Sequence, residues 1–272
     1  MTIMTELRDP ESGCPWDCEQ THERLIRHTL EEAYEVADAI ESGDMDELRD
    51  ELGDLLFQVV FYSRIAEESG DFTIEDVLAG ICDKLTRRHP HVFGEAQFAN
   101  SAELASAWDA IKATERRTRA ESSGDGATEN GALEGVARAL PSLIRATKLN
   151  SRAARAGFEW PSSAQALAKV DEELAELEAE LETSERLDAE VTSRIEHEVG
   201  DLLLAVSNLA RFFDVDPETA LRKANHRFED RFQGMEAICR RDSRSFRELD
   251  LDEKLALWAK AKILERDESD PR

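Results

Sequence analysis

The residues best suited to chemistry are carboxylates that occur twice in the same order. E-E-x-x-E followed by E-x-G-D-L-L stands at 31–35 with 51–56, and again at 172–176 with 198–203. Helical residues three or four apart share a face, so two antiparallel helices can bring four or five of these carboxylates together. Like charges that close destabilise a fold unless cations neutralise them, and oxygen ligands without His or Cys favour Mg²⁺ or Mn²⁺. The two sets are Glu31, Glu32, Glu35, Glu51 and Asp54, and Glu172, Glu173, Glu176, Glu198 and Asp201.

Other interpretations of the carboxylates are weaker. Glutamates opposite leucines also occur on any solvent-facing helix. However, each copy also places a glycine, which costs a helix ~1 kcal/mol, and an aspartate directly before an apolar run. A di-iron bundle needs Glu-x-x-His pairs, which neither copy offers. Cys14 and Cys18 lack a second Cys/His pair with zinc spacing. Repetition of two unfavourable choices at matching places favours a metal site.

Basic residues of the second half complement the carboxylates. Lys169 precedes Glu172 by three positions, and Arg227 and Arg231 follow in a basic stretch. Arginine forks bind phosphate oxygens in bidentate fashion, so a Mg²⁺ cluster beside these cations can hold a polyphosphate. Trp258 either packs in a core or stacks on a base. Taken singly, each cation is an ordinary surface residue; together they indicate an anionic substrate.

Helices must position these residues. Leu167, Val170, Leu174, Leu177 and Leu181 form the stripe of an amphipathic helix over 164–184, and a similar pattern predicts one over 194–213. A capping box at 73–76 predicts a helix over 74–88, and an Asp-Pro pair at 216–217 predicts one over 217–233. Each half continues into a stretch that we expect to be a basic helix, 84–93 and 223–232. Strand-like alternation bounded by hairpin turns is missing from the sequence, so the chain is predicted to be all-α.

The chain divides at a polar, glycine-rich segment. Residues 114–135 have linker composition and separate an N-terminal domain (1–113) from a C-terminal domain (136–272). With 60 acidic and 34 basic residues the formal charge is −26, which excludes nucleic-acid polymers as general partners. Four scattered cysteines, and the lack of any signal-peptide or membrane-spanning stretch, predict a cytoplasmic protein without a membrane partner.

Eight segments, from about Leu7 to Ile263, together resemble the MazG family of nucleoside triphosphate pyrophosphohydrolases. They are CPWDCEQTH (14–22), HTLEEAYEVADAI (28–40), ELGDLLFQVVFY (51–62), RRHPHVFG (87–94), GFEW (157–160), KVDEELAEL (169–177), EVGDLL (198–203) and ANHRFEDRF (224–232). The resemblance implies two tandem helical-bundle domains, completed by homodimerisation. It also implies Mg²⁺-dependent hydrolysis of (deoxy)nucleoside triphosphates to monophosphate and pyrophosphate, as nucleotide-pool housekeeping.

The resemblance further implies roles for individual residues. Glu173, Glu176, Glu198 and Asp201 correspond to metal ligands, Glu172 to a further ligand or the base that orients water, Lys169, Arg227 and Arg231 to the phosphate-binding set, and Trp258 to a nucleotide contact. The C-terminal domain resembles the active copy, because the first half has His28 in place of Lys169 and Val92 near the place of Arg231. The first half retains a second, weaker candidate metal set: Glu32, Glu35, Glu51 and Asp54. A helical module that senses nucleotides without turnover is the alternative, above all for the first half.

Overall fold

The chain forms two compact units, Met1–Gly126 and Ala127–Arg272. The computed structural model describes residues 2–100, 131–183 and 188–269, with positions 103–104, 107–108, 110–111, 114–115 and 118; the side chains of 183 and 264–269 are outside this description. Throughout the described part the regular structure is helical and no strand occurs. The all-α prediction is therefore confirmed. Most of the predicted 114–135 linker lies outside the described residues, so its linker character stays a prediction.

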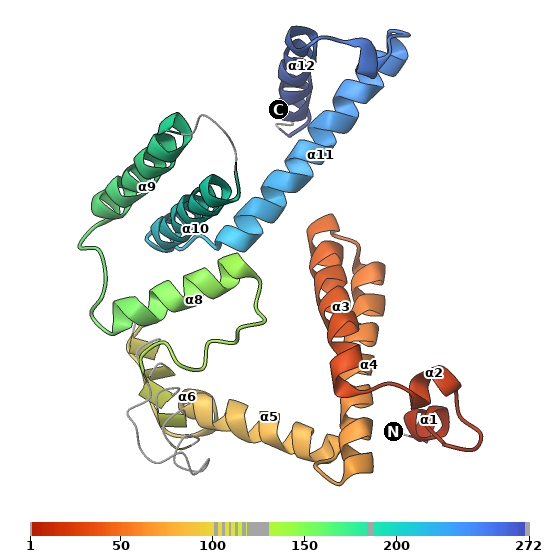
Figure 1. The fold of residues 1–272 in the computed structure, drawn as a ribbon. Coiled ribbons are helices and arrows are strands. Elements are labelled where there is room, and N and C mark those ends of the chain that lie inside the picture. Colours follow the sequence, from red (N-terminus) through yellow and green to blue (C-terminus); the bar gives the residue numbers. More distant parts are fainter. Residues whose placement is uncertain are drawn as a thin grey trace. The chain divides into compact units, whose positions relative to one another are not determined.

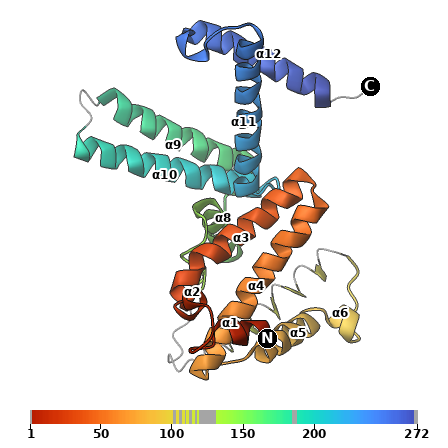
Figure 2. The ribbon, with the colours of Figure 1, turned by 90° about the vertical axis from the view of Figure 1, so that its right-hand side faces the viewer.

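Unit 1 is built around a helical hairpin. Its helices are α1 (Thr2–Leu7), α2 (Pro15–Cys18), α3 (His22–Ser42), α4 (Met45–Ser69), α5 (Ile74–Arg88) and α6 (Pro90–Phe93). Gly43 closes α3 in a left-handed conformation (φ 77°), and the Asp44 side chain then caps α4. Because only two residues separate them, α3 and α4 run antiparallel and side by side (Figures 1 and 2).

A small core holds this hairpin together. Phe61 and Leu25 are fully buried, and Met4 and Ile65 pack with them. The hydroxyls of Thr29 on α3 and Tyr62 on α4 are 2.8 Å apart and hydrogen-bonded. These contacts fix the register of α3 against α4, which in turn sets how their carboxylates face each other.

Unit 2 contains α8 (Ser142–Arg155), α9 (Ser163–Thr183), α10 (Ala189–Arg211), α11 (Pro217–Arg241), the short 3₁₀ helix η1 (Phe246–Glu248) and α12 (Leu251–Ser269). The α9–α10 pair lies side by side and α8 contacts α10, while α11 pairs with α12 (Figures 1 and 2). The buried core of this unit joins α11 to η1 and α12 through Met235, Ile238, Cys239, Leu249, Leu257 and Ala261. The α9–α10 pair is thus the counterpart of α3–α4.

Most predicted helix bounds agree with the structure. The 74–88 helix and its Thr73–Asp76 capping box are as predicted, and Asp216 caps α11 with Pro217 in its first turn. The 164–184 prediction matches α9 to within a residue at each end, whereas α10 starts earlier than 194 and α11 continues beyond 233 to Arg241.

The predicted basic helix over 84–93 is wrong. Helix α5 ends at Arg88, and α6 starts anew at Pro90. Proline lacks a backbone N–H and disfavours the α conformation in the residue before it, here His89, whose φ and ψ are −122° and 57°. The equivalent stretch 223–232 contains no proline and lies within the continuous helix α11.

None of the helices in the described ranges combines the length and apolar character needed to cross a membrane.

Candidate metal and phosphate site

The carboxylates of the second repeat converge between α9 and α10. Glu173 and Glu176 on α9 and Glu198 on α10 each offer an oxygen, and these oxygens lie within 4.8 Å of one another. Glu173 is only 6% exposed, although it is acidic. A carboxylate is buried only when a partner offsets its lost hydration, so this arrangement needs a cation.

Lys169 supplies a cation in the structure as it stands. Its ammonium lies 2.7 Å from the Glu172 carboxylate and 2.8 Å from that of Glu173. These hydrogen bonds hold the pKa of Lys169 above its usual value. For Glu176, desolvation and then the charge of Glu173 raise the pKa of the carboxyl, and the charge of Lys169 offsets only part of this rise. One ammonium does not neutralise the cluster, and a further cation fits there electrostatically.

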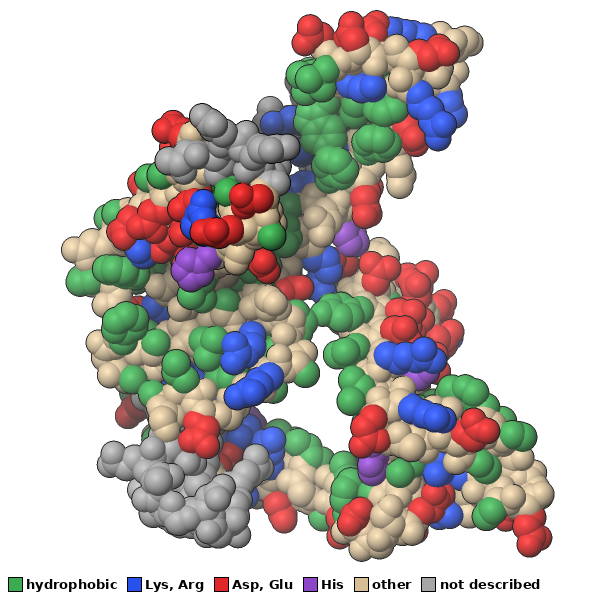
Figure 3. All heavy atoms as spheres, in the orientation of Figure 1, with side chains coloured by type: hydrophobic (Ala, Val, Ile, Leu, Met, Phe, Trp, Pro, Cys, Tyr) green, Lys and Arg blue, Asp and Glu red, His purple; other side chains and the backbone are tan. Residues whose placement is uncertain are grey.

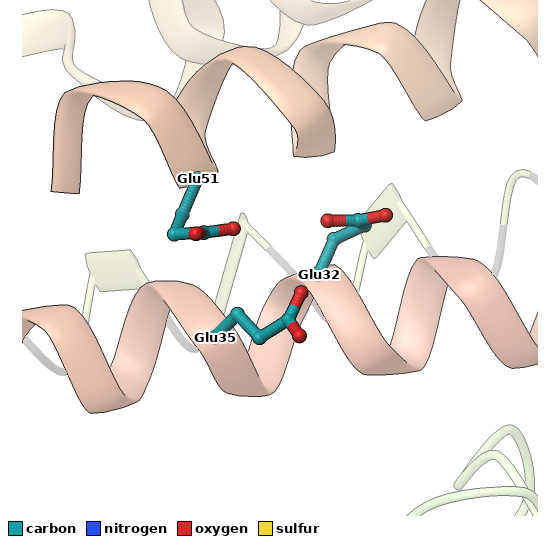
Figure 4. Close-up of side chains that lie close together, drawn as sticks. All are labelled: Glu32, Glu35 and Glu51. Atoms are coloured by element: carbon teal, nitrogen blue, oxygen red, sulfur yellow. The ribbon is translucent and has the colours of Figure 1, made fainter. Parts of the chain in front are cut away.

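The first repeat forms the same cluster in unit 1. Glu32 and Glu35 on α3 and Glu51 on α4 point into the space between the two helices, with an oxygen from each within 4.8 Å of the others (Figure 4). Desolvation and neighbouring carboxylates raise the pKa of Glu32 and of Glu51. His28 Nδ1 lies 3.1 Å from Glu31, as Lys169 lies beside Glu172 in unit 2. The structure thus brings together three carboxylates of each repeated set.

The geometry of these clusters suits a hard divalent ion. Oxygens that each lie about 2.1 Å from Mg²⁺ in octahedral geometry are separated by about 3–4 Å. Oxygens already within 4.8 Å need only small side-chain rotations to reach that spacing. The described residues therefore include two acidic clusters that could bind a metal.

Two members of each five-carboxylate set lie outside the clusters: Glu31 and Asp54 in unit 1, and Glu172 and Asp201 in unit 2. Asp201 Oδ2 lies 3.3 Å from His197 Nε2. Asp54 is exposed, although its charge acts on Glu32. We expected four or five carboxylates to converge at one point; in each unit the tight group contains three. The G-D-L-L aspartates lie one turn from Glu51 and Glu198, at the edge of each group.

Of the two candidate arginines on α11, Arg231 contacts α12 and Arg227 does not join it in any described contact. Arg231 lies over the Trp258 ring at 5.5 Å, and Phe228 contacts the same ring at 5.3 Å. Arg227 is exposed and has no ion pair among the residues that the structure describes. Trp258 therefore takes part in packing, half-buried, with one face covered by an arginine.

The leucines of the hairpins face outward. On α9 and α10 the exposed apolar residues include Leu167, Leu174, Leu181, Leu203 and Leu204. Hydrophobic side chains also reach the surface in Figure 3. The amphipathic pattern predicts the helices correctly, but within a single chain their acidic face, not their leucine face, lies between α9 and α10.

A third repeat escaped the sequence analysis. W-x-x-x-K-x-x-E-R stands at 108–116 and again at 258–266. In unit 1 the Trp108 ring lies 5.3 Å from His89, and in unit 2 Trp258 lies 5.3 Å from Phe228. His89 and Phe228 hold the same position when 84–93 is aligned with 223–232. This shared contact makes Trp108 the counterpart of Trp258, and alignment of the two C-terminal ends of the units would have found it.

Comparisons with known proteins find relatives that are similar over nearly the whole chain. A family model described as the MazG nucleotide pyrophosphohydrolase domain matches residues 20–93. The chain is 45% identical over 267 residues to the nucleoside triphosphate pyrophosphohydrolase of Escherichia coli (strain K12), which covers 98% of this chain and 97% of that protein. It is 39% identical over 262 residues to the nucleoside triphosphate pyrophosphohydrolase/pyrophosphatase MazG of Thermotoga maritima, covering 96% and 94%. A crystal structure of a mazG-related protein from Thermotoga maritima aligns with a TM-score of 0.35 at 26% identity, over 41% of this chain and 94% of that chain.

Proposed function

The chain belongs to the MazG family of nucleoside triphosphate pyrophosphohydrolases, and from that premise we propose that unit 2 contains its active site. The enzyme hydrolyses nucleoside triphosphates to nucleoside monophosphate and pyrophosphate. The observation that carries the assignment to unit 2 is the cluster of Glu173, Glu176 and Glu198, with Lys169 bonded to it.

The metal that we propose is Mg²⁺, with Mn²⁺ as a substitute. The donors are hard carboxylate oxygens, without His or Cys, which is the set that Mg²⁺ prefers. Glu173, Glu176 and Glu198 would hold it, with Asp201 joining after a rotation away from His197. When bound, the metal supplies charge neutralisation of the phosphates and a lowered pKa for water.

Glu172 is then the base of the reaction. Glu172 lies one position before Glu173, is exposed, and does not belong to the tight group. Its carboxylate is oriented by the ion pair with Lys169. A water held by Glu172 attacks the α-phosphorus while its proton passes to that carboxylate, and the bond from the α-phosphorus to the α,β-bridging oxygen breaks. The water oxygen stays on the monophosphate and pyrophosphate leaves, so attack at this position explains why the product is not orthophosphate.

The cations of unit 2 bind the leaving group. Lys169, Arg227 and Arg231 neutralise the negative charge that grows on pyrophosphate as the bond breaks. Arg227 is available because it has no ion pair in the described part of the chain. Trp258, with Arg231 over one face, offers its ring as a nucleotide contact.

A second copy of the chain completes the site in this proposal. Several leucines of α9 and α10 are exposed in the single chain, and a homodimer would bury them. Burial there would also exclude water from the nearby carboxylates and strengthen their hold on a cation. The free cysteines fit a reducing cytoplasm, which is where we place this housekeeping activity.

Matched substitutions in the two repeats test the assignment. Glu198→Ala should abolish pyrophosphate release from nucleoside triphosphates with Mg²⁺, whereas Glu51→Ala, its counterpart in unit 1, should leave most of it. Products are identified by chromatography, so that orthophosphate is distinguished from pyrophosphate. Equal losses in the two variants would contradict the assignment to unit 2, and a major orthophosphate product would overturn the mechanism.

A further inference from the structure

Two adjacent arginines at the end of α5 hold one carboxylate between them. Arg87 donates to Glu115 Oε1 from Nε at 3.0 Å and from Nη2 at 2.6 Å. Arg88 donates to Oε2 from Nε at 3.2 Å and from Nη2 at 2.5 Å. Glu115 comes from the start of the polar 114–135 segment, 27 positions away from Arg88. Two guanidinium groups thus donate hydrogen bonds to both oxygens of one anion, which is also how arginines bind phosphate groups.

The alignment of the two repeats indicates what kind of group this arginine pair binds. When 84–93 is aligned with 223–232, Arg88 holds the position of Arg227, and the Trp108–His89 contact reproduces the Trp258–Phe228 contact at the same 5.3 Å. In unit 2 that arginine has no ion pair among the described residues, whereas in unit 1 it is occupied by Glu115. Among the described side chains, which do not include Glu265 at the position equivalent to Glu115, this arginine is thus unpaired in unit 2 and holds an internal anion in unit 1.

The ring side chains next to the arginine pair also favour a binding site there. The rings of His89 and His91 lie 5.7 Å apart, next to Arg88 in the chain, and Trp108 closes on His89. His91 Nδ1 is buried without a hydrogen-bond partner in the described part of the chain. A buried polar nitrogen without a partner is costly, and such atoms are found where a ligand or water supplies the missing bond.

We propose that Arg87 and Arg88 form a second polyphosphate-binding site, in unit 1, which Glu115 occupies until a di- or triphosphate group displaces it. The group comes either from a nucleoside triphosphate or from released pyrophosphate. This site binds polyphosphate without hydrolysing it, whereas hydrolysis takes place in unit 2. It rests on the proposed function only through the phosphate-binding role of Arg227.

Calorimetric titration with inorganic pyrophosphate tests the site without any hydrolysis. The full chain is used in EDTA, and Arg227→Ala is present throughout to remove the contribution of unit 2. Adding Glu115→Gln removes the competing charge and should tighten pyrophosphate binding by about tenfold or more, the equivalent of about 1.4 kcal/mol. Adding Arg88→Ala to that variant should abolish the gain. Glu67→Gln is the matched control, because Glu67 also accepts from an arginine, Arg64, at 2.9 Å elsewhere in unit 1, and it should change nothing.

Two further measurements keep the proposal open to refutation. Should Glu115→Gln prevent folding, as judged by circular dichroism, Glu115→Asp shortens the carboxylate so that it cannot satisfy both arginines and should also tighten binding. Unchanged affinity in the folded variant, or a gain that persists after Arg88→Ala, would overturn the site. A nucleoside triphosphate with nitrogen at the α,β-bridge distinguishes the sources: a larger gain than with pyrophosphate identifies the nucleotide, and an equal gain identifies the polyphosphate chain alone. Because nothing is hydrolysed, failure here leaves the Glu198 comparison untouched.

Discussion

Lys169 is the internal counter-ion of the acidic cluster, and replacing it should make the fold of unit 2 depend on metal. Its ammonium contacts Glu172 at 2.7 Å and Glu173 at 2.8 Å. Lys169→Met keeps the length of the side chain and removes the charge. Three carboxylate oxygens within 4.8 Å of one another would then have no cation of their own. We therefore expect a loss of stability without metal and its recovery with Mg²⁺.

The size of the loss follows from the exposure of the two partners. The Glu172 side chain is 57% exposed, so solvent screens its pairing, which contributes roughly 0–1 kcal/mol. The Glu173 side chain is 8% exposed, and a hydrogen bond to a buried charge contributes about 1.5–3 kcal/mol. The sum is about 3 kcal/mol, which lowers the unfolding temperature of a domain of this size by roughly 6–12 °C.

Differential scanning calorimetry measures this in EDTA and again with saturating Mg²⁺. Lys148→Met is the control, because Lys148 is an exposed lysine on α8 of the same unit, and its substitution should have little effect in either buffer. In Lys169→Met the deficit should shrink to less than half when Mg²⁺ is added. An equal deficit in both buffers would refute the idea that the ammonium stands in for a metal cation.

Three other predictions follow from single contacts. Arg88 and Arg87 hold the pKa of the Glu115 carboxyl at about 2, against 4.5 ordinarily. The contribution of this ion pair to the stability of the folded state is therefore complete above pH 4.5 and is lost as the pH falls toward 2. The unfolding difference between the wild type and Glu115→Gln in urea should vanish over that interval, and a constant difference would contradict it. Phe61→Ala should cost unit 1 about 3–5 kcal/mol because Phe61 is fully buried; calorimetry should show the transition of unit 2 unmoved. Asp216→Ala removes the hydrogen bond to the Thr219 amide that caps α11 and should cost about 1 kcal/mol in urea unfolding.

Local signals in the sequence predict the helices well. The Thr73–Asp76 capping box and the Asp216–Pro217 pair each act within one turn, and both helices begin where these residues place them. The repeated spacing also predicts that the last two glutamates of each E-E-x-x-E meet the glutamate that opens the next motif, because facing helices joined by a turn leave little choice of register; it wrongly adds the first glutamate and the aspartate. Glu173, Glu176 and Glu198 meet as expected.

Burial and side-chain rotamers were not predictable in the same way, because they depend on which residues pack against a helix face. The pattern around Leu174 fixes the amphipathic period, but it does not reveal that the leucine side is exposed in a single chain while Glu173 is buried. Asp201 lies only three positions from Glu198, yet it turns to His197, a choice of rotamer that spacing does not decide. The prediction of one helix through His89 failed because of a single residue. The basic stretch has a helical pattern in both halves, but in unit 1 Pro90 follows His89 and separates α5 from α6.

In our proposals one duplicated scaffold is divided between turnover in unit 2 and binding in unit 1. Both retain three carboxylates within 4.8 Å, so the acidic cluster alone does not distinguish them. The differences lie in the cations: unit 2 has Lys169 bonded to its cluster where unit 1 has His28, and Arg227 is unpaired among the described residues where Arg88 holds Glu115. A chain with a formal charge of −26 repels polyphosphates almost everywhere on its surface, so the few positions where basic charge is available decide where a triphosphate binds. Because Glu115 holds both Arg87 and Arg88, removing this one acidic residue, far from either cluster in sequence, should create a binding site in unit 1 without adding any cation.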